Sequence, residues 1–402
     1  MAINSVPRLV AVSIGAIALA AALGAQAISS VSTRKMPALA VSTFPANGLA
    51  REALAFQMFS VAAADKEDPA SAARDNAGQA LRAIQSDPLA PKAYAVLAQA
   101  SEDQSVRGDI LEAASVVNRR DLNLQTLLLQ KHVAAGDYTR TIDTLDQILR
   151  VHPEYSPEFF PVLADALTLE QTIPRFVEIL DGSSPWHLKF LTYAVRQNAA
   201  IPNLAVLRPQ ISSADESFDR RLIISLAAQG DIESAAALYR TVADAAETSL
   251  PDGMLDWNTA YPPFDWRFVD QAGFRSQPSR DGEELELFVR PGKGGLVAGR
   301  LLSAPAAPFA IRIDRDIKPA HQREDANVRL TCTNNPQPVL ERTFDTDTTV
   351  FQVPSLPADC QYVVLAINAR AWTGRSALRG TIERIAIVPA GTAATAPSTS
   401  TP

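Results

Sequence analysis

The hydrophobic period of the chain changes once, near residue 246, and this change constrains the fold more than any single motif. From residue 49 to 247 alanine and leucine recur at three- and four-residue steps, which predicts helices throughout. Over residues 261–389 short alternating apolar runs lie between Gly, Pro, Asn and Asp, which predicts strands. The sequence therefore predicts a multidomain chain, a helical region followed by an antiparallel β-sandwich, with a turn-rich bridge at residues 248–260. Residues 390–402 are low in complexity and are expected to be a disordered tail.

The N-terminal segment contains no charged residue over the 20 positions from Leu9 to Ile28. A helix of this length can span the hydrocarbon core of a bilayer. The stretch 25–27 (AQA) also fits the small-x-small cleavage site of a signal peptide. Residues 1–29 are therefore either a membrane anchor or a cleaved signal peptide, and residues 30–48 are expected to form a linker. The anchor, which we favour because the apolar run exceeds a usual signal core, implies a single span in the bacterial inner membrane with the bulk periplasmic. Cleavage implies a soluble periplasmic protein.

The two cysteines, Cys332 and Cys360, both lie in segments predicted to be strands. An even number of cysteines in an exported chain suggests one disulfide, because disulfides persist outside the reducing cytoplasm. The alternative is two unpaired buried thiols. We expect the disulfide.

Composition argues against several kinds of function. The formal charge of -7 argues against a nucleic-acid partner, and none of the four histidines lies within metal-ligand spacing of another. The glycine-rich stretch 292–300 lacks the Lys-Ser/Thr pair of a phosphate loop, so we expect a hairpin turn there. The stretch 345–349 (DTDTT) has too few acidic residues to predict a calcium site. We expect no metal, no cofactor and no catalytic residue. A glycoside hydrolase remains an alternative, since 44 acidic residues could supply two carboxylates.

Two segments of the helical region share a spacing of glycine, aromatic and apolar residues. In residues 130–155 a glycine is followed by an aromatic after two positions and by a proline fifteen positions later, and residues 226–242 repeat much of the pattern. The matching positions are Gly136, Tyr138, Leu145, Ile148, Leu149 and Pro153, and then Gly230, Ile232, Ala235, Tyr239 and Val242. Residues 156–163 restart it, with Phe159 and Leu163 expected to face inward. The segments resemble tetratricopeptide repeats, which implies a solenoid of helix pairs that presents a concave surface to partner proteins. A non-repeating helical bundle is the alternative.

The strand-rich region resembles the jelly-roll sandwiches of the galactose-binding and carbohydrate-binding-module kind. The resemblance lies in a Trp-containing first strand and a last strand of the form SALRGTIERIAIVP, residues 376–389. It implies a fold, and a glycan as the possible ligand, but assigns no residue a role.

Aromatic side chains are the candidate ligand contacts, because the C–H faces of sugars stack on aromatic rings. Trp372 is expected in an exposed loop and is flanked by Arg370 and Arg375. The other candidates surround the start of the first strand: Tyr261, Asp265 and Trp266. Trp266 alternates with Phe268 and can equally be a core residue.

The domain combination resembles the repeat proteins encoded with bacterial exopolysaccharide assembly machinery. This resemblance implies a non-catalytic envelope protein whose helical repeats bind the other envelope proteins of that machinery, while the sandwich binds or guides glycan. A general periplasmic scaffold that binds only proteins is the first alternative. An envelope polysaccharide hydrolase or lyase is the second.

Overall fold

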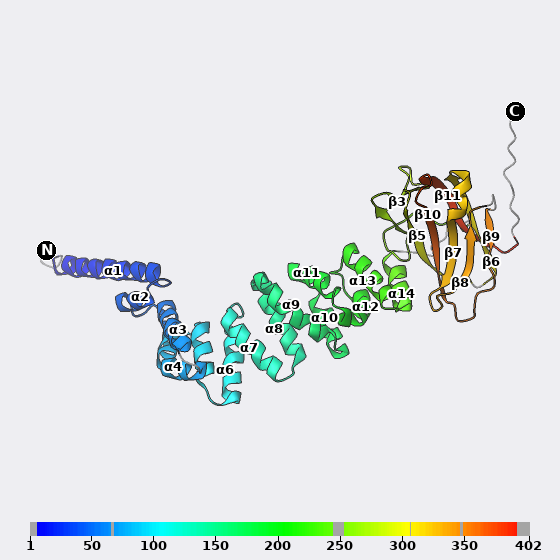
Figure 1. Cartoon of the computed structure of the whole chain (residues 1–402). Coiled ribbons are helices and arrows are strands. Elements are labelled where there is room, and N and C mark those ends of the chain that lie inside the picture. The colour runs from blue at the N-terminus through cyan, green and yellow to red at the C-terminus, as the bar shows by residue number, and fades with distance from the viewer. Residues whose placement is uncertain (1–5, 66–67, 244–252, 306, 346–348, 392–402) are drawn as a thin grey trace. The chain divides into compact units, whose positions relative to one another are not determined.

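In the computed structural model (Figure 1) helices come first and two antiparallel sheets follow, which confirms the predicted fold class. The structure describes residues 6–65, 68–243, 253–305, 307–345 and 349–391. The predicted tail falls almost wholly outside these residues, as does part of the predicted bridge. The chain packs as two compact units, residues 1–186 and 187–402, so the second unit holds the last helices together with the sandwich.

The first helix, α1 (Val6–Ser32), contains the apolar stretch Leu9–Ser32, with a mean hydropathy of 2.0. Within the described residues it is the one helix long and apolar enough to cross a membrane. The segment expected to be a linker carries a short helix, α2 (Pro37–Thr43), which begins with a proline. The Ser29 hydroxyl donates to the Ala40 carbonyl at 2.8 Å, so the end of α1 is fixed against α2.

The remaining helices follow at short intervals. Their bounds are α3 (Gly48–Asp65), α4 (Pro69–Ser86), α5 (Pro91–Ala100), α6 (Gln104–Val117), α7 (Leu122–Ala134), α8 (Tyr138–Val151), α9 (Ser156–Leu167), α10 (Ile173–Ile179), α11 (Pro185–Ala194), α12 (Ile201–Leu207), α13 (Glu216–Ala228) and α14 (Ile232–Val242). Residues 165–220 hold the short helices α10 and α12 among several 3-10 turns.

An aspartate side chain caps the N-terminus of many of these helices. Asp137 accepts a hydrogen bond from the Arg140 amide at 3.0 Å, and Asp231 accepts one from the Ser234 amide at 3.1 Å. Each cap satisfies an amide that the helix itself leaves without a partner. At both places the preceding glycine has a positive φ, 66° at Gly136 and 85° at Gly230, which ends the preceding helix. The two predicted helix pairs, α7–α8 and α13–α14, are therefore each joined by a Gly-Asp turn of the same kind.

Small and branched apolar residues fill the space between the helices. In the part around α4 and α5 the core is mostly alanine, which lets helices approach closely: Ala73, Ala80, Ala83, Ala90, Ala93 and Val96 are fully buried. Leu145, Ile148 and Leu149 of α8 are also buried, as predicted. In α9 the prediction is half wrong, because Phe160, not Phe159, is buried together with Leu163. Phe160 lies three residues and Phe159 four residues before Leu163, so both border the same helix face, and Phe159 is half-buried at its margin.

Two antiparallel sheets form the sandwich. The first has the strand order β1-β5-β10-β7-β8, and the second has the order β2-β3-β4-β11-β6-β9. The bounds are β1 (Arg267–Phe268), β2 (Asp270–Gln271), β3 (Phe274–Pro278), β4 (Leu285–Val289), β5 (Lys293–Ser303), β6 (Phe309–Lys318), β7 (Ala326–Cys332), β8 (Pro338–Thr343), β9 (Val350–Gln352), β10 (Tyr362–Ala371) and β11 (Leu378–Pro389). A 3-10 helix, η5 (Ala320–Asp325), precedes β7.

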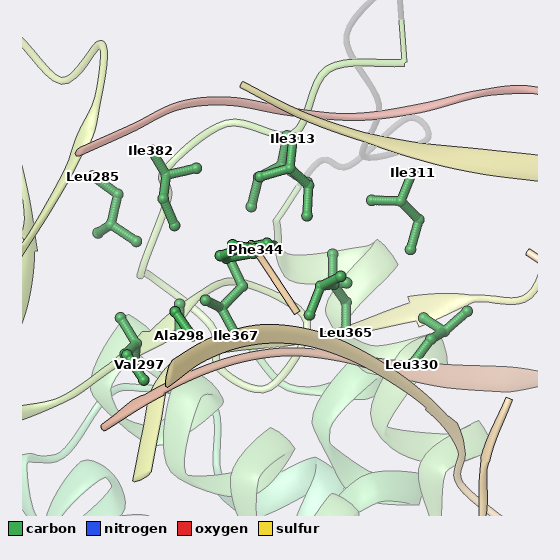
Figure 2. Packing of buried hydrophobic residues seen from close by; sticks show 14 of the residues in the cluster. Leu285, Val297, Ala298, Ile311, Ile313, Leu330, Phe344, Leu365, Ile367 and Ile382 are labelled. Atoms are coloured by element: carbon green, nitrogen blue, oxygen red, sulfur yellow. The ribbon is translucent and has the colours of Figure 1, made fainter. Parts of the chain in front are cut away.

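The alternating residues of the strands meet between the sheets to form one core. Figure 2 shows Leu285, Ile311, Ile313 and Ile382 on one side facing side chains of the other sheet, with Phe344 between the layers. The predicted disulfide Cys332–Cys360 is present and ties the end of β7 to the segment before β10. An N-terminal apolar helix, whether membrane anchor or signal peptide, and a disulfide together suggest that the folded part lies outside the cytoplasm.

The glycine-rich stretch 292–300 corrects one prediction. It is not a hairpin turn as a whole: only Gly292 lies in the turn, and residues 293–303 form β5. Gly294 and Gly295, with φ of 159° and 146°, lie at its start, opposite Arg370 and Ala369 of β10. A Cβ on Gly294 would lie 2.7 Å from the Arg370 Cα, so glycine is required for the two strands to approach there.

Candidate functional site

Three of the predicted ligand-binding residues gather at one end of the sandwich. Arg370 is the penultimate residue of β10, and Trp372 and Arg375 lie in the loop from β10 to β11. Trp372 is the largest exposed aromatic side chain of the described sandwich, with 49% of its surface accessible. The loop bends over the end of η5, which supplies the acidic residues Glu324 and Asp325.

Asp325 fixes the orientation of the Trp372 ring. One of its carboxylate oxygens accepts a hydrogen bond from Trp372 Nε1 at 2.9 Å, and the other accepts one from Arg375 Nη1 at 3.1 Å. Both bonds are charge-assisted and are therefore stronger than neutral ones. The Asp325 side chain is only 10% exposed, so the aspartate is itself held in place. The indole ring is therefore exposed, and the hydrogen bond at its Nε1 holds it in place.

Two arginines lie beside the ring, and only one of them is paired with carboxylates of the described residues. The Arg370 Cζ lies 4.5 Å from the centroid of the Trp372 ring, which is a cation–π contact. Arg375 is neutralised by Asp325 and by Glu324, whose carboxylate lies 3.7 Å away. Arg370 forms no ion pair with any residue that the structure describes. The cluster therefore offers a fixed aromatic surface beside one uncompensated cation.

A cleft of about 460 Å³ lies on the same sheet, where the chain passes from β1 in one sheet to β2 in the other. Its lining includes Arg267, Asp270 and Gln271 on one side and Gly294–Leu296 of β5 on the other. β1 pairs with β5 only at Ala298 and Gly299, so the residues of β5 before Ala298 have no partner on β1. The floor of the cleft adjoins the Trp372 cluster because Gly294 lies opposite Arg370 in the β5–β10 register.

The other predicted site residues lie in a buried joint between α14 and the sandwich. Asp265 is 1% exposed and accepts hydrogen bonds from the Tyr239 hydroxyl at 2.9 Å and from the Tyr261 amide at 2.8 Å. The Tyr239 ring stacks on Phe264, with the two centroids 5.0 Å apart. Burial, and secondarily the Asp265 carboxylate, raise the pKa of Tyr239, so its hydroxyl stays a donor.

Arg300 completes the joint and is almost fully buried. Its Nη1 donates to the Asp256 carboxylate at 2.9 Å, and its Nη2 lies 3.9 Å from the Asp265 carboxylate. Two carboxylates thus compensate one buried guanidinium, which is the condition for a charge to be tolerated inside a fold. This arrangement gives Asp265 a structural role.

Trp266 belongs to the core, which corrects its assignment as a ligand contact. It is 0% exposed, its ring stacks on Phe268 at 6.2 Å, and its Nε1 donates to the Asp256 carbonyl at 2.6 Å. The alternation of Trp266 and Phe268 points both rings between the sheets. Tyr261 is half-buried and contacts the Tyr239 ring edge-on. Trp257 also packs on the core.

Some residues of the Trp372 cluster and of the buried joint could not be found from the sequence. Asp325 lies 47 positions before Trp372, and no pattern links the two. Arg300 sits in a glycine-rich stretch that gives no sign of burial. The paired glycines 294 and 295 were the one available signal, since consecutive glycines in a strand mark a close backbone approach.

In the described part of the chain, no three His, Cys, Asp or Glu side chains lie together in a metal-binding arrangement. The sequence stretch 345–349 lies mostly outside the described residues.

Comparison of the sequence with known protein families and with curated proteins gave no match. Among solved structures, a chain from the crystal structure of accessory secretory protein 1, 2 and 3 in Streptococcus pneumoniae is similar at 9% identity. The alignment covers 35% of this chain and 96% of that chain, with a TM-score of 0.24. At this level the likeness says nothing about function.

Proposed function

We propose that this chain is a non-catalytic glycan-binding protein of the cell envelope, with the Trp372 cluster as its glycan contact. The observation that carries the proposal is the half-exposed indole whose Nε1–H is held by Asp325. An exposed tryptophan on a protein surface exposes a large apolar area to water, and a ligand that covers it gains free energy.

The ring and its neighbours match what a sugar offers. The apolar C–H face of a pyranose can cover the exposed part of the indole, while its hydroxyls take hydrogen bonds from Arg370 and Arg375. The Asp325 hydrogen bonds fix the ring before a ligand arrives, so little side-chain entropy is lost on binding. The adjoining cleft provides room for further sugar units.

The rest of the chain supports a role in polysaccharide biosynthesis or export at the bacterial inner membrane. The apolar helix α1 can hold the protein at the membrane, and the disulfide fits an oxidising compartment such as the periplasm. In the proposal the helical region recruits envelope proteins of a polysaccharide assembly system while the sandwich holds the glycan.

A glycan array tests this function with the full-length protein purified in detergent. We expect the wild type to bind a subset of glycans, Trp372→Ala to lose about 30-fold in affinity, and Trp372→Phe to retain most of it. Val364→Ala is the matched control, since Val364 is an exposed apolar side chain of β10 that lies six residues, or about 20 Å at 3.3 Å per residue, before Arg370. Absence of binding by the folded wild type, or equal binding by Trp372→Ala, would refute the proposal and favour a protein-only scaffold.

A further inference from the structure

One cation without an ionic partner among the described residues lines the cleft beside Trp372, and three more lie on the chain segments next to it. Arg267 lines the cleft itself, and Lys293 begins the β5 strand that forms its other wall. Arg290 lies in the turn before β5, where its amide donates to the Gly273 carbonyl at 2.7 Å. Together with Arg370, these side chains form no ion pair with any residue that the structure describes.

The acidic residues of this region do not balance these cations. Asp270 is the one carboxylate in the lining of the cleft. Glu324 and Asp325 are both engaged by Arg375, and Asp325 is held by Trp372 as well. Four cations therefore lie on or next to the elements that form the cleft, whose lining holds one carboxylate, on a chain whose formal charge is -7. A local excess of one sign against the overall charge is the arrangement that attracts a ligand of the opposite sign.

The spacing of these groups follows from the sheet. Arg267 lies opposite Gly299, and Arg370 lies opposite Gly294, so the two guanidinium groups border the same stretch of β5. That stretch is about five residues, or roughly 17 Å at 3.3 Å per residue. Leu296, an exposed apolar side chain of the cleft, lies between them. Two cations thus lie on either side of an apolar side chain along β5.

We infer that the ligand of this site is an acidic polysaccharide, whose carboxylates meet the cations around the cleft while its rings contact Trp372 and Leu296. The inference rests on the proposed glycan function and narrows it to one class. A guanidinium can take a carboxylate with two parallel hydrogen bonds between opposite charges, whereas a neutral sugar offers it only uncharged hydroxyls. Unpaired cations next to an aromatic surface therefore discriminate uronic acids from neutral hexoses of the same linkage.

Matched pairs of oligosaccharides test the inference with the full-length protein. The probes are hexamers of galacturonate, mannuronate, guluronate and glucuronate, each beside its carboxyl-reduced form, which has the same linkages without charge. We expect at least one acid to bind about tenfold or more tightly than its reduced form at 20 mM salt. We also expect this preference to shrink at 300 mM salt, because partly exposed charges are screened.

Charge-removing variants locate the effect. We expect Arg267→Gln combined with Lys293→Gln to lose most of the preference for the acid, with little change in affinity for the reduced form. The control combines Arg280→Gln and Arg384→Gln, two exposed arginines on the strands and turns of the other sheet that form no ion pair with a described residue. It should keep the full preference.

Each outcome of this experiment bears on one claim. Equal or tighter binding of the reduced forms would overturn the acidic-ligand inference and leave the glycan function standing. An acid preference that the Arg280/Arg384 control abolishes equally would overturn the assignment to the cleft. Absence of binding to every probe and to the glycan array would overturn the proposed function itself.

Discussion

The hydrogen bond from Tyr239 to Asp265 provides a sharp prediction about how the second unit is held together. Tyr239→Phe removes only the hydroxyl that donates to a carboxylate with 1% exposure. The remaining neighbours of that oxygen do not replace it, since Arg300 Nη2 lies 3.9 Å away. Loss of a hydrogen bond to a buried charge costs about 1.5–3 kcal/mol.

Because both groups are buried, solvent screening does not reduce this cost. For a folded unit of about 200 residues, 2 kcal/mol corresponds to a fall in Tm of roughly 4–8 °C. Urea unfolding of the full-length protein, followed by tryptophan fluorescence, measures the change. Trp257 and Trp266 lie next to the joint and report on it.

The control is Tyr138→Phe, a tyrosine of α8 that is 42% exposed and makes no hydroxyl hydrogen bond with a described residue. It should change stability by less than about 0.5 kcal/mol. In a double-mutant cycle, Tyr239→Phe and Asp265→Asn should couple by about 1 kcal/mol or more. If Tyr239→Phe is as stable as the wild type, or if the two changes add without coupling, the reasoning about this joint is wrong.

Three further predictions concern stability. Replacing Cys332 and Cys360 by serine should cost about 3–4 kcal/mol in urea unfolding, because the bridge closes a loop of 28 residues; an unchanged midpoint under reducing and oxidising conditions would contradict this. Gly380→Ala should abolish folding or cost more than about 2 kcal/mol, since its Cβ would lie 2.3 Å from the Asp316 carbonyl oxygen. Gly78→Ala in α4 meets no atom within 4 Å and should stabilise the protein by about 0.5–1 kcal/mol. Similar effects of the two changes would refute the steric argument. Tyr239 ionises at higher pH in the folded than in the unfolded chain, because burial and Asp265 raise its pKa above 10.0. Its contribution to the free energy of unfolding is therefore complete below pH 10 and is lost as the pH rises above that value. The wild type should lose stability above pH 10 more steeply than Tyr239→Phe.

The fold could be predicted because its determinants are local. Alternation in runs such as residues 285–289 and 326–332 places every second side chain in one core, and the structure shows this burial. The disulfide followed from export and from there being two cysteines. The helix pairs followed from Gly136 and Gly230, whose positive φ ends one helix before an aspartate begins the next.

The candidate site could be predicted only in part, because exposure and orientation depend on distant residues. Trp372 stands two positions after Arg370 and Trp266 stands next to Arg267, yet one tryptophan is 49% exposed and the other fully buried. What separates them is contact with Asp325 and with Phe268, of which only the second is near in sequence. The burial of Arg300 depends on Asp256, 44 positions away, and left no sequence signal.

The central claim is that glycan binds on the exposed face of Trp372. Isothermal titration of the tightest glycan from the array against the wild type, Trp372→Phe and Trp372→Ala measures this directly. We predict affinities in that order, with about a 30-fold loss for alanine and a loss of less than about fivefold for phenylalanine. Equal affinities for the three proteins would contradict the central claim.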